Sequence, residues 1–109
     1  MKKVNPFYKS KRWIKKKNHI LKKYEYTCQQ TLRYGTTVDA ETVHHIYPLE
    51  LYPELALVDW NLLPVTGEAH NTFHSRKDHS ITAKGKYWQK KRRKEFEKWK
   101  RKKSNPPLI

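Results

Sequence analysis

Apolar residues recur at helical spacing near both ends of the chain. Five of them share one face of a helix that would begin after Ser10, a good N-cap: Trp13, Ile14, Ile20, Leu21 and Tyr24. A second helix is predicted over residues 84–103, where Trp88, Phe96 and Trp99 fall on one stripe. Aromatic stripes of this kind are more typical of core contacts than of base-stacking platforms.

The middle of the chain has shorter-range patterns. Residues 41–51 have strand character interrupted by Pro48, and residues 60–65 resemble a second short strand. Thr66 is a good N-cap, and a helix is predicted after it over residues 67–79. The order strand, loop, strand, helix predicts an α+β core at residues 38–79. A basic helical arm at 1–27, the helix at 84–103 and a tail at 104–109 would complete a single domain.

The charge is distributed unevenly over the 109 residues. The chain has 25 lysines and arginines, 10 acidic residues and a net charge of +15. Residues 1–23 carry ten basic residues and no acidic one, and residues 84–109 carry twelve against two, whereas the centre is mildly acidic. Basic arms favour a polyanion partner, because each contact with a phosphate releases counterions. A basic solubilising surface is the alternative.

Seven basic residues are candidates for contact with nucleic acid: Lys15, Lys16, Arg76, Lys77, Lys90, Lys91 and Arg93. For Arg76 and Lys77 a solvated helix face is an equally good interpretation. A single cysteine, Cys28, excludes a disulfide within the chain. No apolar run approaches the roughly 20 residues that span a bilayer. We therefore expect a cytoplasmic protein without a membrane partner.

Two histidine pairs carry the candidate chemistry. His44 and His45 are neighbours in the first predicted strand, so their side chains should point to opposite faces and cannot share one role. His70 and His74 are four residues apart, which on a helix would bring both within reach of one metal ion. A half-buried strand and a solvent-facing helix would explain the same pairs without any function. A divalent cation, a free imidazole and a polyanion partner together suit phosphodiester hydrolysis.

Three motifs now coincide: TVHHI, WNLLPV and EAHNTFH, preceded by FYKSKRWIKKKNHILKKYEYTC. Together they resemble the HNH endonucleases, specifically the small phage-encoded type, whose core is a ββα-metal finger. The resemblance covers about residues 7–79. It implies a metal-dependent endonuclease that hydrolyses DNA by nicking or double-strand cleavage, leaving 5′-phosphate and 3′-hydroxyl ends. It also implies a role in phage DNA processing or packaging, with phage packaging proteins as further partners.

The roles implied by the resemblance fall on five residues. His44, His70 and His74 match metal ligands, and His45 matches the general base that activates water. Asn61 would brace the opposite loop and orient His45 through hydrogen bonds. Without the resemblance, Asn61 reads as a turn residue after a strand.

The expected cofactor is one divalent metal ion: Mg, Mn, Ni or Zn. Imidazole ligands favour the softer ions, whereas the family is usually supported by Mg or Mn. Relatives often hold a structural zinc through two C-x-x-C pairs, but those positions read Cys28, Thr31, Thr66 and Ala69. We therefore expect no structural zinc. The alternative function is a non-catalytic nucleic-acid-binding protein whose histidines form a structural metal site.

Overall fold

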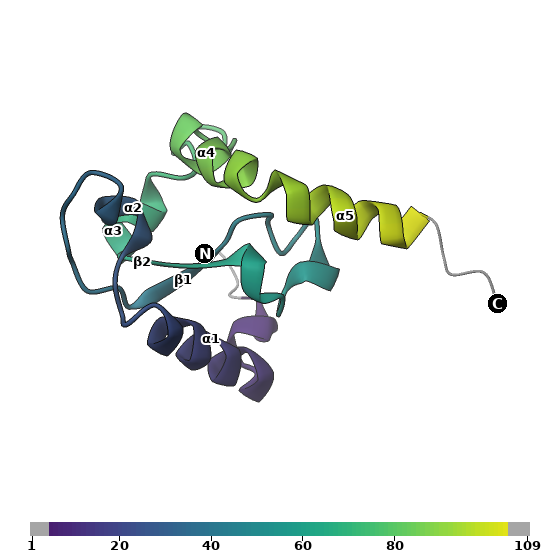
Figure 1. Ribbon diagram of the computed structural model, residues 1–109, viewed down its shortest axis with the longest axis horizontal. Helices are drawn as coiled ribbons and strands as arrows, with labels where there is room; N and C mark the ends of the chain where they lie inside the picture. The colour runs from purple at the N-terminus through teal and green to yellow at the C-terminus, as the bar shows by residue number, and fades with distance from the viewer. Residues whose placement is uncertain (1–4, 105–109) are drawn as a thin grey trace.

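The computed structural model describes residues 5–104 and consists of short helices around one two-stranded sheet (Figure 1). The elements, with η for a 3-10 helix, are η1 Pro6–Lys9, α1 Lys11–Lys23, α2 Gln29–Leu32, β1 Thr42–His45, η2 Pro53–Leu55, η3 Asp59–Asn61, β2 Leu62–Val65, α3 Gly67–Asn71, α4 Ala83–Lys91 and α5 Arg93–Ser104. The start of the predicted arm, residues 1–4, and tail residues 105–109 lie outside the described range. No helix within that range is long and apolar enough to cross a membrane.

The N-terminal helix begins where the sequence predicts. The hydroxyl of Ser10 accepts a hydrogen bond from the backbone N–H of Trp13 at 3.2 Å, which caps α1. Trp13, Ile20 and Leu21 are buried, whereas Ile14 at the edge of the predicted stripe is exposed. Their apolar face packs against both strands, and α1 runs along one side of the hairpin in Figure 1.

The two strands are antiparallel neighbours in the small α+β fold. His44 lies opposite Leu63 and His45 opposite Leu62 in the register. The strand predicted over 41–51 is only four residues long, because the chain turns after Ile46 and the carbonyl of Pro48 accepts two turn hydrogen bonds. All four residues of β2 are buried, because helices cover the hairpin from more than one side.

The helix predicted over 67–79 is wrong in length, since α3 ends at Asn71. Phe73 then turns into the core with no exposed surface, and its carbonyl accepts the backbone N–H of Thr82 at 2.9 Å. His74 pairs with Ile81 in an isolated antiparallel bridge. His74 is therefore not on the same helix as His70. Its position is set by its pairing with Ile81, which no local sequence pattern predicts.

The single helix predicted over 84–103 is also wrong, because α4 and α5 are separated at Arg92. Trp88 of α4 is buried beside α2, where its indole N–H donates to a glutamine. Phe96 of α5 instead stacks on Tyr47, with ring centroids 3.9 Å apart and an interplanar angle of 2°. The aromatic stripe thus serves two different parts of the fold, and the chain bends at Arg92 to reach both.

Candidate active site

Three of the four candidate histidines lie together. His44 of β1 is buried, and its ring centroid lies 5.0 Å from that of His70 on α3 and 6.3 Å from that of His74. Phe73 packs against this group from the core, with its ring centroid 4.5 Å from that of His44. The fold therefore brings the three predicted metal ligands together from a strand, a helix and the segment that follows it.

The chemistry of this cluster fits a cation. Burial, with a smaller contribution from the neighbouring histidines, holds the pKa of His44 well below its usual value, and burial also lowers the pKa of His70. Neutral imidazole is the form that binds metals. The Nε2 atom of His44 is buried and has no hydrogen-bond partner among residues 5–104, a costly state that a metal bond would relieve. Within residues 5–104, however, no three metal-binding side chains already converge on one point.

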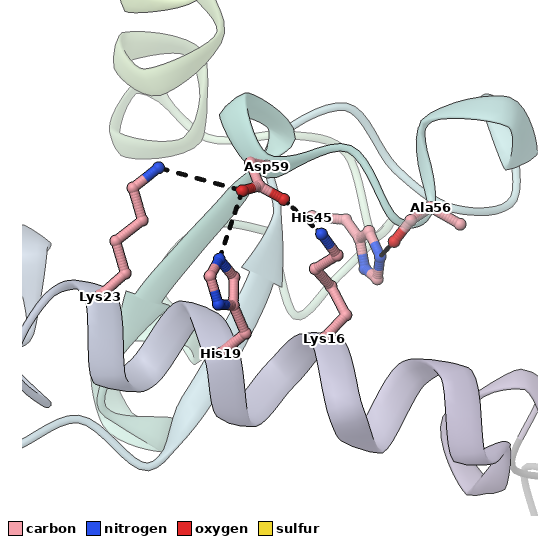
Figure 2. A network of polar contacts seen from close by, with 6 residues as sticks. All are labelled: Lys16, His19, Lys23, His45, Ala56 and Asp59. Atoms are coloured by element: carbon pink, nitrogen blue, oxygen red, sulfur yellow. Dashed lines mark hydrogen bonds and ion pairs between the residues drawn. The ribbon is translucent and has the colours of Figure 1, made fainter.

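His45 faces the side of the strand opposite to His44, as the alternation of neighbouring side chains in a strand predicts. Its ring stacks on Trp13 with centroids 4.9 Å apart and an interplanar angle of 27°. Its Nε2 lies 3.0 Å from the backbone carbonyl of Ala56 (Figure 2). Because a carbonyl oxygen only accepts, Nε2 must carry the proton in this contact, and the neutral ring keeps its lone pair on Nδ1. Nδ1 has no hydrogen bond to any residue of the described range.

The surroundings of His45 act on its pKa in opposite directions. Burial lowers the pKa, whereas the Ala56 carbonyl and the carboxylate of Glu50 raise it by favouring the protonated ring. Burial is the largest of these effects, so the ring is neutral near pH 7. A neutral imidazole with one fixed N–H and one free lone pair can accept a proton.

Asn61 makes no hydrogen bond with His45 but fixes the backbone around it. Its side chain is fully buried, and its Oδ1 accepts the backbone N–H of Tyr47 at 2.7 Å. Its Nδ2 donates to the carbonyls of Tyr47 at 3.1 Å and Leu55 at 3.2 Å. Leu55 immediately precedes Ala56, so Asn61 fixes the segment whose next carbonyl contacts His45. These hydrogen bonds hold the backbone on both sides of the β1–β2 loop, so any effect of Asn61 on His45 passes through the backbone.

All four candidate histidines line one open groove of about 1000 Å³. Two cations border it, Lys17 from α1 and Arg76 from the turn after α3. Sequence reasoning named Arg76 but missed Lys17, because all the lysines of this arm look alike without knowledge of which face of α1 is docked. It also missed Tyr8, Glu50 and His79, which line the same groove.

The other predicted DNA contacts are spread over the surface. Lys16 donates to the carboxylate of Asp59 at 2.6 Å, and Lys23 and His19 lie near the same carboxylate (Figure 2). Lys90 and Arg93 line a second, smaller hollow of about 320 Å³ between α4 and α5. The remaining three, Lys15, Lys77 and Lys91, are exposed. Lys16 is thus engaged by Asp59, whereas Lys17 has no ion pair within the described part of the chain.

The four positions that would hold a structural zinc, of which only Cys28 is a cysteine, lie next to one another. The Cys28 side chain is buried and accepts the backbone N–H of Thr66 at 3.3 Å. Thr31 donates its hydroxyl to the Cys28 carbonyl, and the Thr66 hydroxyl caps α3 by accepting the backbone N–H of Ala69. A closed zinc site needs four such ligands, and one thiol is present. Hydrogen bonds join these segments instead.

Comparison with known structures reveals a similar protein. The crystal structure of the HNH endonuclease of the deep-sea thermophilic bacteriophage GVE2, with manganese ion, matches with a TM-score of 0.58 and 32% sequence identity. The match covers 60% of this chain and 71% of that chain. No protein-family model matches the sequence, and no curated protein is found to be similar to it.

Proposed function

This chain belongs to the HNH endonuclease family, and we propose that it is a divalent-metal-dependent endonuclease that hydrolyses phosphodiester bonds of DNA. One observation carries the proposal. Adjacent histidines of β1 face different surroundings, His44 with an unpartnered buried nitrogen beside two more imidazoles, and His45 with a free Nδ1. Metal binding and proton transfer need these two different environments.

In the proposed reaction, His45 acts as the general base. Its Nδ1 takes a proton from the attacking water. Nε2 remains protonated and hydrogen-bonded to the Ala56 carbonyl, so that the ring stays in one orientation. The Glu50 carboxylate favours the imidazolium that forms. Asn61 is a positioning residue in this scheme, because it holds the backbone at Tyr47 and Leu55 and does not reach the reacting atoms.

His44, His70 and His74 are the residues that would hold the divalent cation. When bound, the cation supplies positive charge that stabilises the phosphate in the transition state and the leaving 3′-oxygen. The low pKa values of His44 and His70 keep their lone pairs available near neutral pH. Because the GVE2 enzyme was crystallised with manganese, Mn²⁺ is the first ion to test, before Mg²⁺, Ni²⁺ and Zn²⁺.

The DNA backbone would follow the groove between α1 and the turn after α3. Lys17 and Arg76 border this groove near the histidines and would contact phosphates on its two sides. Lys90 and Arg93 would contact the flanking duplex from their own hollow. Contacts to phosphates carry little sequence information, so we expect weak sequence preference. The similarity to a bacteriophage enzyme supports a role in phage DNA processing.

Cleavage of supercoiled plasmid tests the proposal. Purified protein freed of metal by a chelator should nick or linearise the plasmid when Mn²⁺ is restored. His45→Ala should lower the rate by a factor of about 10² or more while DNA binding is retained. Wild-type protein that binds plasmid and cuts it with none of the four ions would contradict the proposal and favour the non-catalytic binding protein.

A further inference from the structure

We propose that Trp13 of α1 is a positioning residue that fixes the ring plane of His45 for proton transfer. The inference rests on the proposed function and adds a role for the N-terminal helix. The two rings are stacked, 4.9 Å apart at 27°, and only 4% of Trp13 and 6% of His45 is exposed. Trp13 also borders the groove that contains the histidines.

One hydrogen bond does not define the orientation of an imidazole. The Ala56 carbonyl fixes the position of Nε2 but leaves the ring able to pivot about that contact. A flat aromatic surface against the face of the ring removes this freedom and thereby sets the direction of Nδ1. Phe7 and Tyr8 complete the enclosure, with centroids 6.0 and 6.1 Å from His45. Proton transfer depends on this direction, because the base must meet the water along its lone pair.

Trp13 is itself held firmly enough to serve as a support. Its backbone N–H donates to the hydroxyl of the cap residue Ser10. The centroid of its ring lies 5.4 Å from that of Phe7 and 5.8 Å from that of Tyr8. The helix that carries Trp13 is anchored to η3, because Lys16 donates a hydrogen bond to the carboxylate of Asp59 at 2.6 Å. Figure 2 shows this anchor and the contact of His45 with the Ala56 carbonyl on the same side of α1, the helix whose Trp13 stacks on His45.

Cleavage kinetics of four variants test the role. Trp13→Leu should lower the single-turnover rate at least tenfold without changing DNA affinity, and Trp13→Phe should restore most of the rate because it keeps an aromatic face. Trp88→Leu is the matched control: Trp88 is also buried, at 6% exposed, but its indole binds Gln30. It should lower stability without the rate loss. In the His45→Ala background, Trp13→Leu should cause no further loss.

Two patterns of rate loss would overturn the inference. One is an equal rate loss in Trp13→Leu and Trp88→Leu, and the other is a full further loss from Trp13→Leu when His45 is already absent. A wild-type protein that does not cleave would contradict the proposed function instead. A protein that cleaves through His45 but is indifferent to Trp13→Leu would contradict this inference alone.

Nuclear magnetic resonance tests the stacking without cleavage, and also serves if Trp13→Leu does not fold. The ring protons of His45, assigned by comparison with His45→Ala, should be shifted upfield in the wild type by the indole ring current. In Trp13→Phe the upfield shift should shrink, because a phenyl ring has a weaker ring current. Unshifted His45 ring protons in the wild-type protein would overturn the inference.

Discussion

Asn61 and Tyr47 are joined by two hydrogen bonds that run in opposite directions. The backbone N–H of Tyr47 donates to Oδ1 of Asn61 at 2.7 Å, and Nδ2 of Asn61 donates to the carbonyl of Tyr47 at 3.1 Å. The side-chain amide of asparagine supplies the acceptor oxygen and the donor nitrogen that this arrangement needs. The asparagine of the motif is therefore a connection between the two ends of the β1–β2 loop.

Replacing Asn61 by alanine should destabilise the protein and impair cleavage. Three buried side-chain hydrogen bonds at about 1 kcal/mol each predict a loss of about 3 kcal/mol in the free energy of unfolding. Urea denaturation measures this loss, with the exposed Asn18→Ala as control. The cleavage rate, measured where both variants are folded, should fall only in Asn61→Ala. Unchanged stability would contradict the bracing role.

Metal binding should stabilise the wild-type protein but not a variant without the central ligand. At a metal concentration about 100 times Kd, the gain is about 2.7 kcal/mol. His44→Leu fills a similar volume and removes the unpartnered Nε2, so this variant should be as stable as wild type without metal but show no gain with Mn²⁺. Thermal unfolding with and without Mn²⁺ measures both. The exposed His19→Gln is the control; a gain retained in His44→Leu would show that metal binds elsewhere.

DNA affinity should depend on salt through Lys17 and Arg76. Each phosphate contact contributes about 0.9 to the slope of log K against log salt concentration. Lys17→Gln and Arg76→Gln should each reduce the slope by about this amount. Lys16→Gln, one position away on α1, is the matched control, because Lys16 is engaged by Asp59. Equal slope changes in Lys16→Gln and Lys17→Gln would contradict the prediction that Lys17, and not Lys16, contacts a phosphate.

The anchor at Asp59 predicts a pH dependence of stability. The hydrogen bond from Lys16 is the largest cause that lowers the pKa of Asp59 below its unfolded value. Its contribution is therefore present above the unfolded pKa and disappears as the pH falls through the folded pKa. Asp59→Asn should be less stable than wild type at pH 7 by less than about 1 kcal/mol, since the pair is partly exposed.

Urea denaturation of both proteins at pH 7 and at acid pH measures this difference, which should vanish once Asp59 is protonated. Glu97→Gln, which removes an exposed pair with Arg93, is the control and should change stability little at either pH. A stability difference for Asp59→Asn that is as large in acid as at pH 7 would contradict the assignment.

Local signals in the sequence were sufficient for part of this fold. The cap at Ser10, the opposite faces of His44 and His45, and the turn into α3 at Thr66 each depend on a few neighbouring residues. The end of α3 and the bend at Arg92 depend on distant ones, because Thr82 binds the backbone of Phe73 and Phe96 stacks on Tyr47.

The same distinction applies to the site. The histidine and asparagine types were readable from the motifs, whereas the neighbours that control their orientation were not. Nothing in the sequence indicates that Trp13 lies on His45, or that Lys17 faces the groove while Lys16 faces Asp59. Both facts follow from how α1 docks on the hairpin.

The loop between β1 and β2 is fastened from both ends of the described chain. Lys16 of α1 holds Asp59 across 43 positions, and Lys103 of α5 holds Glu54 across 49 positions. Contacts between residues so far apart carry a loop-closure cost, so we expect them to form late in folding. The carbonyl of Ala56 lies between these two fastenings. We therefore expect the β1–β2 loop, whose Ala56 carbonyl orients His45, to be the last region to assemble and the first to open in hydrogen exchange.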